Sequence, residues 1–231
     1  MHLLVTRPLP DAERTAQALR ERGHRVTLAP VLQLEVIEVA VGDGPYAAVV
    51  MTSANAARAI AQHPRLPSLT ALPAFTVGAH TAATARRIGF ASVTSADGAL
   101  PDVARLIAAT LPPGRLLYLA AEQRAGDLDS LLAADGFRVD TVVSYRMVAN
   151  PALAQDLRAA LAARPDGVLH YSGRSAQMFL AGAEAAGVLD AVRTLTHYCL
   201  SADVSAPLHD AGAGTVKIAA QPNEAAMMAL L

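Results

Sequence analysis

The chain has 231 residues, of which 53% are hydrophobic and 4% aromatic, with one cysteine and no tryptophan. Its 19 basic and 20 acidic side chains give a formal net charge of -1, so no global field attracts nucleic acid or an anionic membrane. The lone Cys199 excludes an internal disulfide, and the apolar runs are too short for a signal peptide or for the ~18 residues of a membrane span. We expect a cytoplasmic globular protein whose anion sites are local.

Strand-to-helix junctions recur along the chain in the same order in each half. In the first half, an expected strand at residues 3–6 is followed by a helical pattern that ends at Gly23. In the second half, an expected strand at residues 116–119 is followed by a helical pattern that ends at Gly136. Later strands that each precede a helix are expected at 48–53, 75–78, 167–172 and 197–201, with Gly89 and Gly212 ending two of those helices. Glycine at these helix ends predicts left-handed C-caps.

Proline and alternating segments complete the pattern. Pro101 and Pro222 each open an Ala/Leu-rich helix, with proline expected in the first helical turn. Residues 30–36 and 142–148 alternate apolar and polar side chains, which predicts extended connectors that pair with each other. Short apolar strands between amphipathic helices predict parallel sheets covered on both faces, in two α/β domains.

Familiar cofactor and catalytic motifs are missing from the sequence. It contains no H-E-x-x-H, G-x-S-x-G or Walker segment, and Gly212-Ala213-Gly214 lacks the third glycine and the preceding strand of a dinucleotide fingerprint. The seven histidines are scattered, with no pair at metal-ligand spacing on one predicted element. We therefore expect no metal and no cofactor.

Polar residues instead follow the predicted strands, at the edge where ligands bind in open α/β sheets. Several helix N-termini at one edge, with two arginines, suit an anionic ligand. Taken singly, each hydroxyl can be read as a helix cap, and each arginine as a solvated surface residue. The candidates are Thr6, Arg7, Thr52, Ser53, Asn55, Gly78, Thr81, Ser172, Arg174, Ser175 and Ser201.

In order and spacing, six segments resemble the uroporphyrinogen-III synthase family. They are Thr6-Arg7-Pro8, Pro30-Val31-Leu32, Thr52-Ser53-Ala54-Asn55-Ala56, Val77-Gly78-Ala79-His80-Thr81-Ala82, Ser144-Tyr145 and Tyr171-Ser172-Gly173-Arg174-Ser175. The resemblance implies two flavodoxin-like parallel-sheet domains joined by a two-stranded antiparallel linker. One domain would combine residues 1–33 and 150–231, the inserted domain would span 37–145, and the linker strands would be 30–37 and 142–149.

The resemblance also implies a reaction. Members are cyclising hydro-lyases of haem biosynthesis, which close hydroxymethylbilane to uroporphyrinogen III and invert ring D through a spiro intermediate, without a cofactor. Tyr145 matches the family's linker tyrosine and would assist the departing hydroxyl, while the strand-end residues would bind substrate carboxylates. The implied protein is a monomer that meets hydroxymethylbilane synthase transiently and binds neither nucleic acid nor membrane.

One segment departs from the family pattern. Where many members have a Gly-Pro-Thr-Thr-like sequence, this chain has Ser201-Ala202-Asp203-Val204. A hydroxyl contact is lost, and a carboxylate stands near the site expected to bind a polyanion. The alternative is that Asp203 caps the following helix by accepting from its backbone N–H groups. That departure favours one alternative, a non-catalytic paralogue that binds a tetrapyrrole or a small anion. Solute-binding proteins and sensors also have two α/β domains. A nucleotide-dependent enzyme is disfavoured because the phosphate loop is absent.

Overall fold

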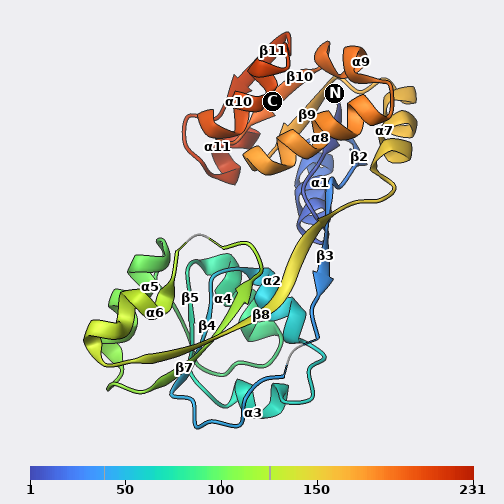
Figure 1. Cartoon of the computed structure of the whole chain (residues 1–231). Coiled ribbons are helices and arrows are strands. Elements are labelled where there is room, and N and C mark those ends of the chain that lie inside the picture. The colour runs from blue at the N-terminus through green and yellow to red at the C-terminus, as the bar shows by residue number, and fades with distance from the viewer. Residues whose placement is uncertain (39, 125) are drawn as a thin grey trace. The chain divides into compact units, whose positions relative to one another are not determined.

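The computed structural model describes residues 1–38, 40–124 and 126–231. Contacts divide the chain into two compact units, each with its own sheet (Figure 1). Unit 1 comprises Met1–Gln33 and Val148–Leu231, and unit 2 comprises Leu34–Met147. Adjacent strands are parallel through most of both sheets, so the predicted mixed α/β class with parallel sheets is confirmed.

The sheet of unit 1 has five strands in the order β11-β10-β9-β1-β2, with every neighbouring pair parallel. Numbered by their occurrence in the unit, they lie in the order 2-1-3-4-5, which is the flavodoxin-like order. The direction of winding reverses between β1 and β9, so this is the topological switch point. The strands are β1 (His2–Val5), β2 (Arg25–Leu28), β9 (Gly167–His170), β10 (Thr196–Cys199) and β11 (Thr215–Ile218).

Helices cover this sheet because its strands are apolar on both faces. All four residues of β1 are buried, as are those of β9. Strands of this kind occur where both faces of a parallel sheet are packed. The helices of the unit are α1 (Asp11–Glu21), α7 (Leu153–Ala162), α8 (Gly173–Ala185), α9 (Leu189–Arg193), α10 (Ala202–Asp210) and α11 (Glu224–Met228).

The sheet of unit 2 has the order β3-β8-β7-β4-β5-β6. Its five parallel strands, numbered by occurrence from β4, lie in the order 3-2-1-4-5. Counted from β7, where the second repeat begins, the same sheet has the order 2-1-3-4-5 that unit 1 has from β1. The chain adds β5 and β6 on one side of β4 before it crosses to β7 on the other, which places the switch point between β4 and β7. The strands are β3 (Leu32–Val36), β4 (Ala48–Met51), β5 (Ala74–Thr76), β6 (Val93–Ser95), β7 (Arg115–Ala121) and β8 (Arg138–Ala149).

Both faces of the unit 2 sheet are packed. Alternate residues of β4 contribute to separate cores, Val49 and Met51 to one and Ala48 and Val50 to the other, as the two-residue period of a strand requires. The surrounding helices are α2 (Ala54–Ile60), α3 (Leu66–Thr70), α4 (Ala79–Arg87), α5 (Leu100–Thr110), α6 (Leu128–Leu132) and the short 3-10 helix η1 (Ala133–Asp135).

Strand β8 is one continuous element of 12 residues, and its neighbour β3 lies at the edge of the sheet (Figure 1). The Ile37 N–H donates to the Ser144 carbonyl, and the Asn150 N–H donates to the Val31 carbonyl, both at 3.0 Å. Partner numbers rise on one segment as they fall on the other, which is the pattern of antiparallel strands.

The predicted helix ends agree with the structure at all four glycines and at one of the two prolines. Backbone φ is positive at Gly23, Gly89, Gly136 and Gly212, and Pro101 lies in the first turn of α5. The expectation for Pro222 is wrong, because it precedes the helix. Asn223 takes the N-cap position of α11, where its side chain accepts a hydrogen bond from the Ala226 N–H.

Candidate active site

The predicted site residues gather largely at the carboxyl ends of the strands in both sheets. At the switch point of unit 2, Thr52 follows β4 and lies beside β7. At the switch point of unit 1, Arg7 follows β1 while Tyr171 follows β9. Ligands of open α/β sheets bind outside such points, because the flanking connections leave in opposite directions there.

Two neighbouring hydroxyl residues at the end of β4 each contact a different tyrosine. The Thr52 Oγ1 lies 3.1 Å from the Tyr118 hydroxyl, and the Ser53 side chain is hydrogen-bonded to the Tyr145 phenol. Ser53 also caps α2 by accepting from the Asn55 N–H at 3.2 Å. Sequence reasoning missed Tyr118, whose only signal was a polar-tipped aromatic within an otherwise aliphatic strand.

Tyr145 carries a neutral phenol at physiological pH. Its side chain is 5% exposed, and burial raises the pKa of Tyr145, with the hydrogen bond from Ser53 offsetting part of this effect and Tyr118 adding to it. A neutral phenol with a raised pKa donates a hydrogen bond and does not act as a base. Tyr145 therefore suits the support of an oxygen that gains negative charge.

A cavity of about 250 Å³ opens at this end of the unit 2 sheet. Thr52, Tyr118 and Tyr145 supply three hydroxyls to its wall, while the remaining lining is mostly apolar. Cavities with an apolar wall and a few convergent polar groups are typical ligand sites. The other lining residues are Val77, Leu100, Ala121, Gln123 and Arg124.

The remaining predicted residues of unit 2 differ in their freedom to meet a ligand. Asn55 accepts a 2.6 Å hydrogen bond from Arg58, and Thr81 is 7% exposed in the first turn of α4. Gly78 is the N-cap of α4 with extended backbone and no side-chain cap, and no atom lies within 4 Å of where its Cβ would be. The N-terminus of α4 is therefore open to an approaching anion.

A charged network occupies the switch point of unit 1. Arg7 lies 4.3 Å from the Tyr171 ring centroid and forms a 3.0 Å ion pair with Glu224. The same Glu224 carboxylate accepts hydrogen bonds from Thr15 at 3.0 Å and from the Tyr171 hydroxyl at 3.1 Å. Burial, with Glu224 nearby, raises the pKa of Tyr171. Thr15, Tyr171 and Glu224 were absent from the predicted set, because nothing in the spacing brings Glu224 to β1.

Other predicted residues of unit 1 are partly engaged within the fold. The Thr6 hydroxyl is fully buried and donates to the Leu169 carbonyl at 2.8 Å. Ser172 caps α8 by accepting from the Ser175 N–H, and its own hydroxyl donates to the Ser175 Oγ. Arg174 lies exposed in the first turn of the same helix.

The segment that departs from the family pattern begins α10. Ser201 is the N-cap residue, and its side chain makes no capping hydrogen bond. Asp203 lies in the first turn rather than at the cap position, so the suggestion that it caps the helix is wrong. Its carboxylate is exposed and close to the helix N-terminus, where negative charge is favourable.

Comparisons with known proteins identify the family. A family model described as uroporphyrinogen-III synthase HemD matches residues 13–229, which is most of the chain. The chain belongs to the uroporphyrinogen-III synthase family. Uroporphyrinogen-III synthases are cyclising lyases of haem biosynthesis. No curated protein matches the sequence.

Solved structures show the same fold as this uroporphyrinogen-III synthase family member. The uroporphyrinogen-III synthetase of Helicobacter pylori has a TM-score of 0.68 at 19% identity, covering 100% of this chain and 98% of that one. A mutant uroporphyrinogen III synthase from Thermus thermophilus has a TM-score of 0.53 at 17% identity, covering 100% and 96%. At such identities the likeness establishes the fold alone.

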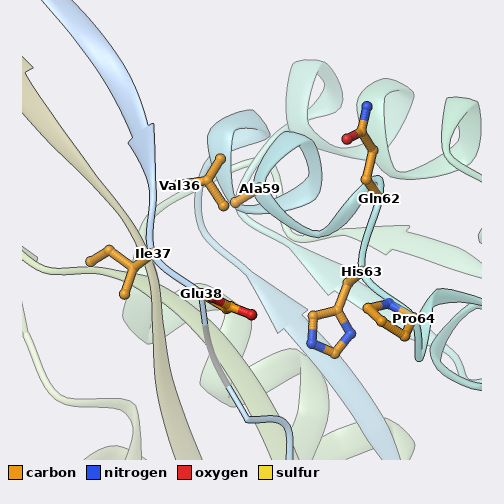
Figure 2. Close-up of a pocket in the computed structure, with 7 residues that line it drawn as sticks. All are labelled: Val36, Ile37, Glu38, Ala59, Gln62, His63 and Pro64. Carbon is orange, nitrogen blue, oxygen red and sulfur yellow. The ribbon is translucent and has the colours of Figure 1, made fainter.

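A larger cavity of about 400 Å³ lies elsewhere in unit 2 and contains none of the predicted synthase site residues. Figure 2 shows Glu38, from the segment after β3, and His63, from the segment after α2, pointing toward the same hollow. The carbonyl end of α2 and the Glu38 carboxylate make this region unsuited to a polyanion. The smaller cavity, which Thr52 and Tyr145 line, is therefore the stronger candidate.

Among residues 1–38, 40–124 and 126–231, no three His, Cys, Asp or Glu side chains are placed to hold a metal ion together. Over the same residues, no helix has the length and apolar character needed to cross a membrane.

Proposed function

We propose that this chain cyclises hydroxymethylbilane to uroporphyrinogen III and inverts ring D through a spiro intermediate. The family match over residues 13–229 carries the proposal. The cavity of unit 2 supports it, because neutral hydroxyl donors line a partly apolar pocket at the switch point. We further propose that the chain acts as a monomeric cytoplasmic enzyme, with units 1 and 2 joined by β3 and β8, and that it meets hydroxymethylbilane synthase transiently.

The reaction requires little acid–base power from the protein. The carbon–oxygen bond of the hydroxymethyl group breaks, the oxygen leaves as water with one added proton, and the resulting azafulvene cation is attacked by ring D. The final closure releases one proton from ring D, so protons balance. Tyr145 donates a hydrogen bond to the departing oxygen, while water delivers the proton. The raised pKa of Tyr145 agrees with this role, since a phenol that stays neutral keeps its proton for donation.

Control of geometry is the larger task of the site. The same cation closes directly to the type I isomer in solution, so the enzyme must favour one near-attack arrangement over another. The enzyme would orient the substrate through its carboxylates, which hydroxyls, helix N-termini and arginines would bind. The assigned binding residues are Thr6, Arg7, Thr52, Ser53, Asn55, Gly78, Thr81, Ser172, Arg174, Ser175 and Ser201.

A coupled assay tests this function. Hydroxymethylbilane is generated in place with hydroxymethylbilane synthase, the products are oxidised, and the uroporphyrin I and III isomers are separated chromatographically. We expect mainly type III with the chain present and type I without it. Type I alone at the spontaneous rate would reject the proposal and favour the non-catalytic paralogue, which tetrapyrrole binding would then identify.

A further inference from the structure

Alternation along the end of β4 directs its two hydroxyl residues to opposite faces of the unit 2 sheet. Thr52 contacts Tyr118, whose ring packs in the core formed with α5 and α6. Ser53 contacts Tyr145, whose ring packs in the core formed with α2 and α4. The end of β4 is thus held between two phenols, one on each face.

Both phenols belong to the same cavity although their rings lie in different cores. Tyr118 is 2% exposed and Tyr145 is 5% exposed, yet both line the cavity together with Thr52. Thr52 and Tyr118 also join β4 to β7, the two strands that flank the switch point. The Thr52–Tyr118 contact therefore fixes the wall of the site at the place where the fold favours a ligand.

We propose that Tyr118 is a positioning residue of this site, acting through Thr52; the inference rests on the proposed function. The hydroxyl groups lie 3.1 Å apart, and the phenol is the more acidic of the two. When the phenol donates to the Thr52 Oγ1, the threonine proton is left for another acceptor. That proton then points to a substrate carboxylate in the cavity, and the orientation of ring D depends on it.

A purely structural role makes a different prediction. The Tyr118 ring fills the core between β7 and the helices α5 and α6, so Tyr118→Phe retains the packing and removes only the hydroxyl. If the ring alone matters, this variant folds and turns over like the parent. If the hydroxyl positions Thr52, the variant folds but loses substrate affinity and isomer control.

The chain supplies a matched control in Tyr46. This tyrosine is also buried, and its hydroxyl donates to Asp140 at 2.9 Å, but it precedes β4 at the opposite end of the strand and does not line the cavity. Tyr46→Phe therefore removes a buried, hydrogen-bonded phenol hydroxyl from the same unit without touching the site.

The experiment compares Tyr118→Phe, Thr52→Val, the double variant, Thr52→Ser and Tyr46→Phe in the isomer assay. We expect Tyr118→Phe and Thr52→Val each to lower kcat/KM by roughly 5- to 30-fold, mainly through KM, as loss of a hydrogen bond to a charged group predicts. Both should raise the share of type I product. The double variant should be no worse than the more impaired single variant, because the two hydroxyls act as one unit. Thr52→Ser, which keeps the hydroxyl, should recover most of the activity that Thr52→Val loses, whereas Tyr46→Phe should remain close to the parent.

Each outcome of this experiment either supports or overturns the positioning role of Tyr118. Parental kinetics in Tyr118→Phe, or effects that multiply in the double variant, would overturn the role of Tyr118 while the parent's type III product still upholds the proposed function. A loss of activity that disappears after correction for the folded fraction, measured by thermal unfolding, would make Tyr118 structural and overturn the inference. A parent chain that yields only type I would reject the proposed function itself and the inference with it.

Discussion

The two switch points of this molecule have the same position in their sheets but differ in how their polar side chains are paired. In unit 1 the point is occupied by ionised groups that neutralise each other, with Arg7 paired to Glu224. In unit 2 it carries the uncharged hydroxyl residues Thr52, Tyr118 and Tyr145 in the wall of a cavity whose lining also includes Arg124. Parallel strands thus bring polar side chains to one edge in both units, but only the local partners decide how those side chains are engaged.

This difference bears on how each region could treat a polyanion. A carboxylate that approaches Arg7 competes with Glu224, which already satisfies the guanidinium, Thr15 and Tyr171. A carboxylate that approaches the unit 2 cavity meets hydrogen-bond donors, and the partner of Thr52 there is a phenol rather than a carboxylate. We expect the hydroxyl-lined cavity of unit 2 to contribute chemistry and orientation, and the ion-paired region of unit 1 to contribute affinity alone.

The largest expected effect follows from removing the reactive-site phenol. Tyr145→Phe should lower kcat roughly 10- to 100-fold, the lower end of what a positioned proton or hydrogen-bond donor contributes. The type III isomer should remain the main product, because Tyr145 assists departure of the hydroxyl whereas Thr52 orients the ring. Single-turnover assays with isomer analysis measure both quantities. An unchanged rate would show that Tyr145 takes no part in the chemistry, and unit 2 would then differ from unit 1 only in how it binds the substrate.

Unit 1 also buries two imidazoles, those of His170 and His197, which are hydrogen-bonded to each other. The His197 Nε2 lies 3.1 Å from the Val192 carbonyl, which can only accept, so this nitrogen carries the proton. The neutral His197 Nδ1 then accepts from the His170 Nε2 at 3.0 Å. The His170 Nδ1 is left as a buried acceptor with no hydrogen-bond partner among the described residues.

Acid should therefore destabilise unit 1 more than unit 2. Burial lowers the pKa of His170 well below 6.5, with His197 adding to the shift, and burial lowers the pKa of His197 as well. Below pH 6.5 both histidines bind protons in the unfolded chain but stay neutral in the folded unit. The stability that is present above pH 6.5 is therefore lost as the pH falls toward the pKa values of the two histidines in the folded state. Each histidine contributes a slope of up to about 1.4 kcal/mol per pH unit.

Hydrogen exchange read by mass spectrometry measures this difference between the units. After correction for intrinsic rates, peptides from β9 and β10 should lose protection between pH 7 and pH 5.5 before peptides from β4 and β7. Cys199 gives a second probe, since its thiol is fully buried and burial raises the pKa of Cys199 to about 12. It should react with thiol reagents only when unit 1 opens. Equal loss of protection in both units would contradict the assignment to the imidazoles.

Much of this organisation could be predicted from the sequence, and the exceptions have physical reasons. Local signals were sufficient for the parallel sheets and for helix ends such as Gly136, because a left-handed C-cap depends on neighbouring residues alone. The strand order of unit 2 could not be read in this way, since nothing local tells a chain on which side of β4 the next strand will add. The resemblance implied flavodoxin-like order for both units; the order 2-1-3-4-5 is found in unit 1 counted from β1, and in unit 2 only when the strands are counted from β7.

The site shows the same limit. Strand-end position indicated Thr52 and Arg7, but not their partners, which come from distant parts of the chain: Tyr118 is 66 residues from Thr52, and Glu224 is 217 residues from Arg7. Such pairings depend on the tertiary fold. A strand-end motif therefore predicts where polar groups collect and leaves open whether they are available to a ligand.

A smaller effect is expected from the ion pair of unit 1. Glu224→Gln keeps the shape but removes the charge that competes for Arg7, so KM should fall by up to about fivefold, the range of a partly exposed ion pair. Stability should drop by no more than about 1 kcal/mol, because Glu224 is 42% exposed. Arg7→Ala should raise KM in the same steady-state assay. If neither variant changes KM, Arg7 serves the fold of unit 1 and binds no substrate.

The smallest expected effect on stability lies at Gly78, where the structure leaves room for a methyl group. The backbone is extended, with φ -154°, and no atom lies within 4 Å of the added Cβ, so Gly78→Ala should change the unfolding free energy by less than about 0.5 kcal/mol. The methyl would stand before the open N-terminus of α4, and KM should rise if substrate carboxylates bind there. Ser201→Ala is the matched variant in unit 1, since α10 also begins without a side-chain capping bond. A rise in KM for Gly78→Ala alone would concentrate recognition in unit 2, whereas equal rises would show that both sheet edges hold the substrate.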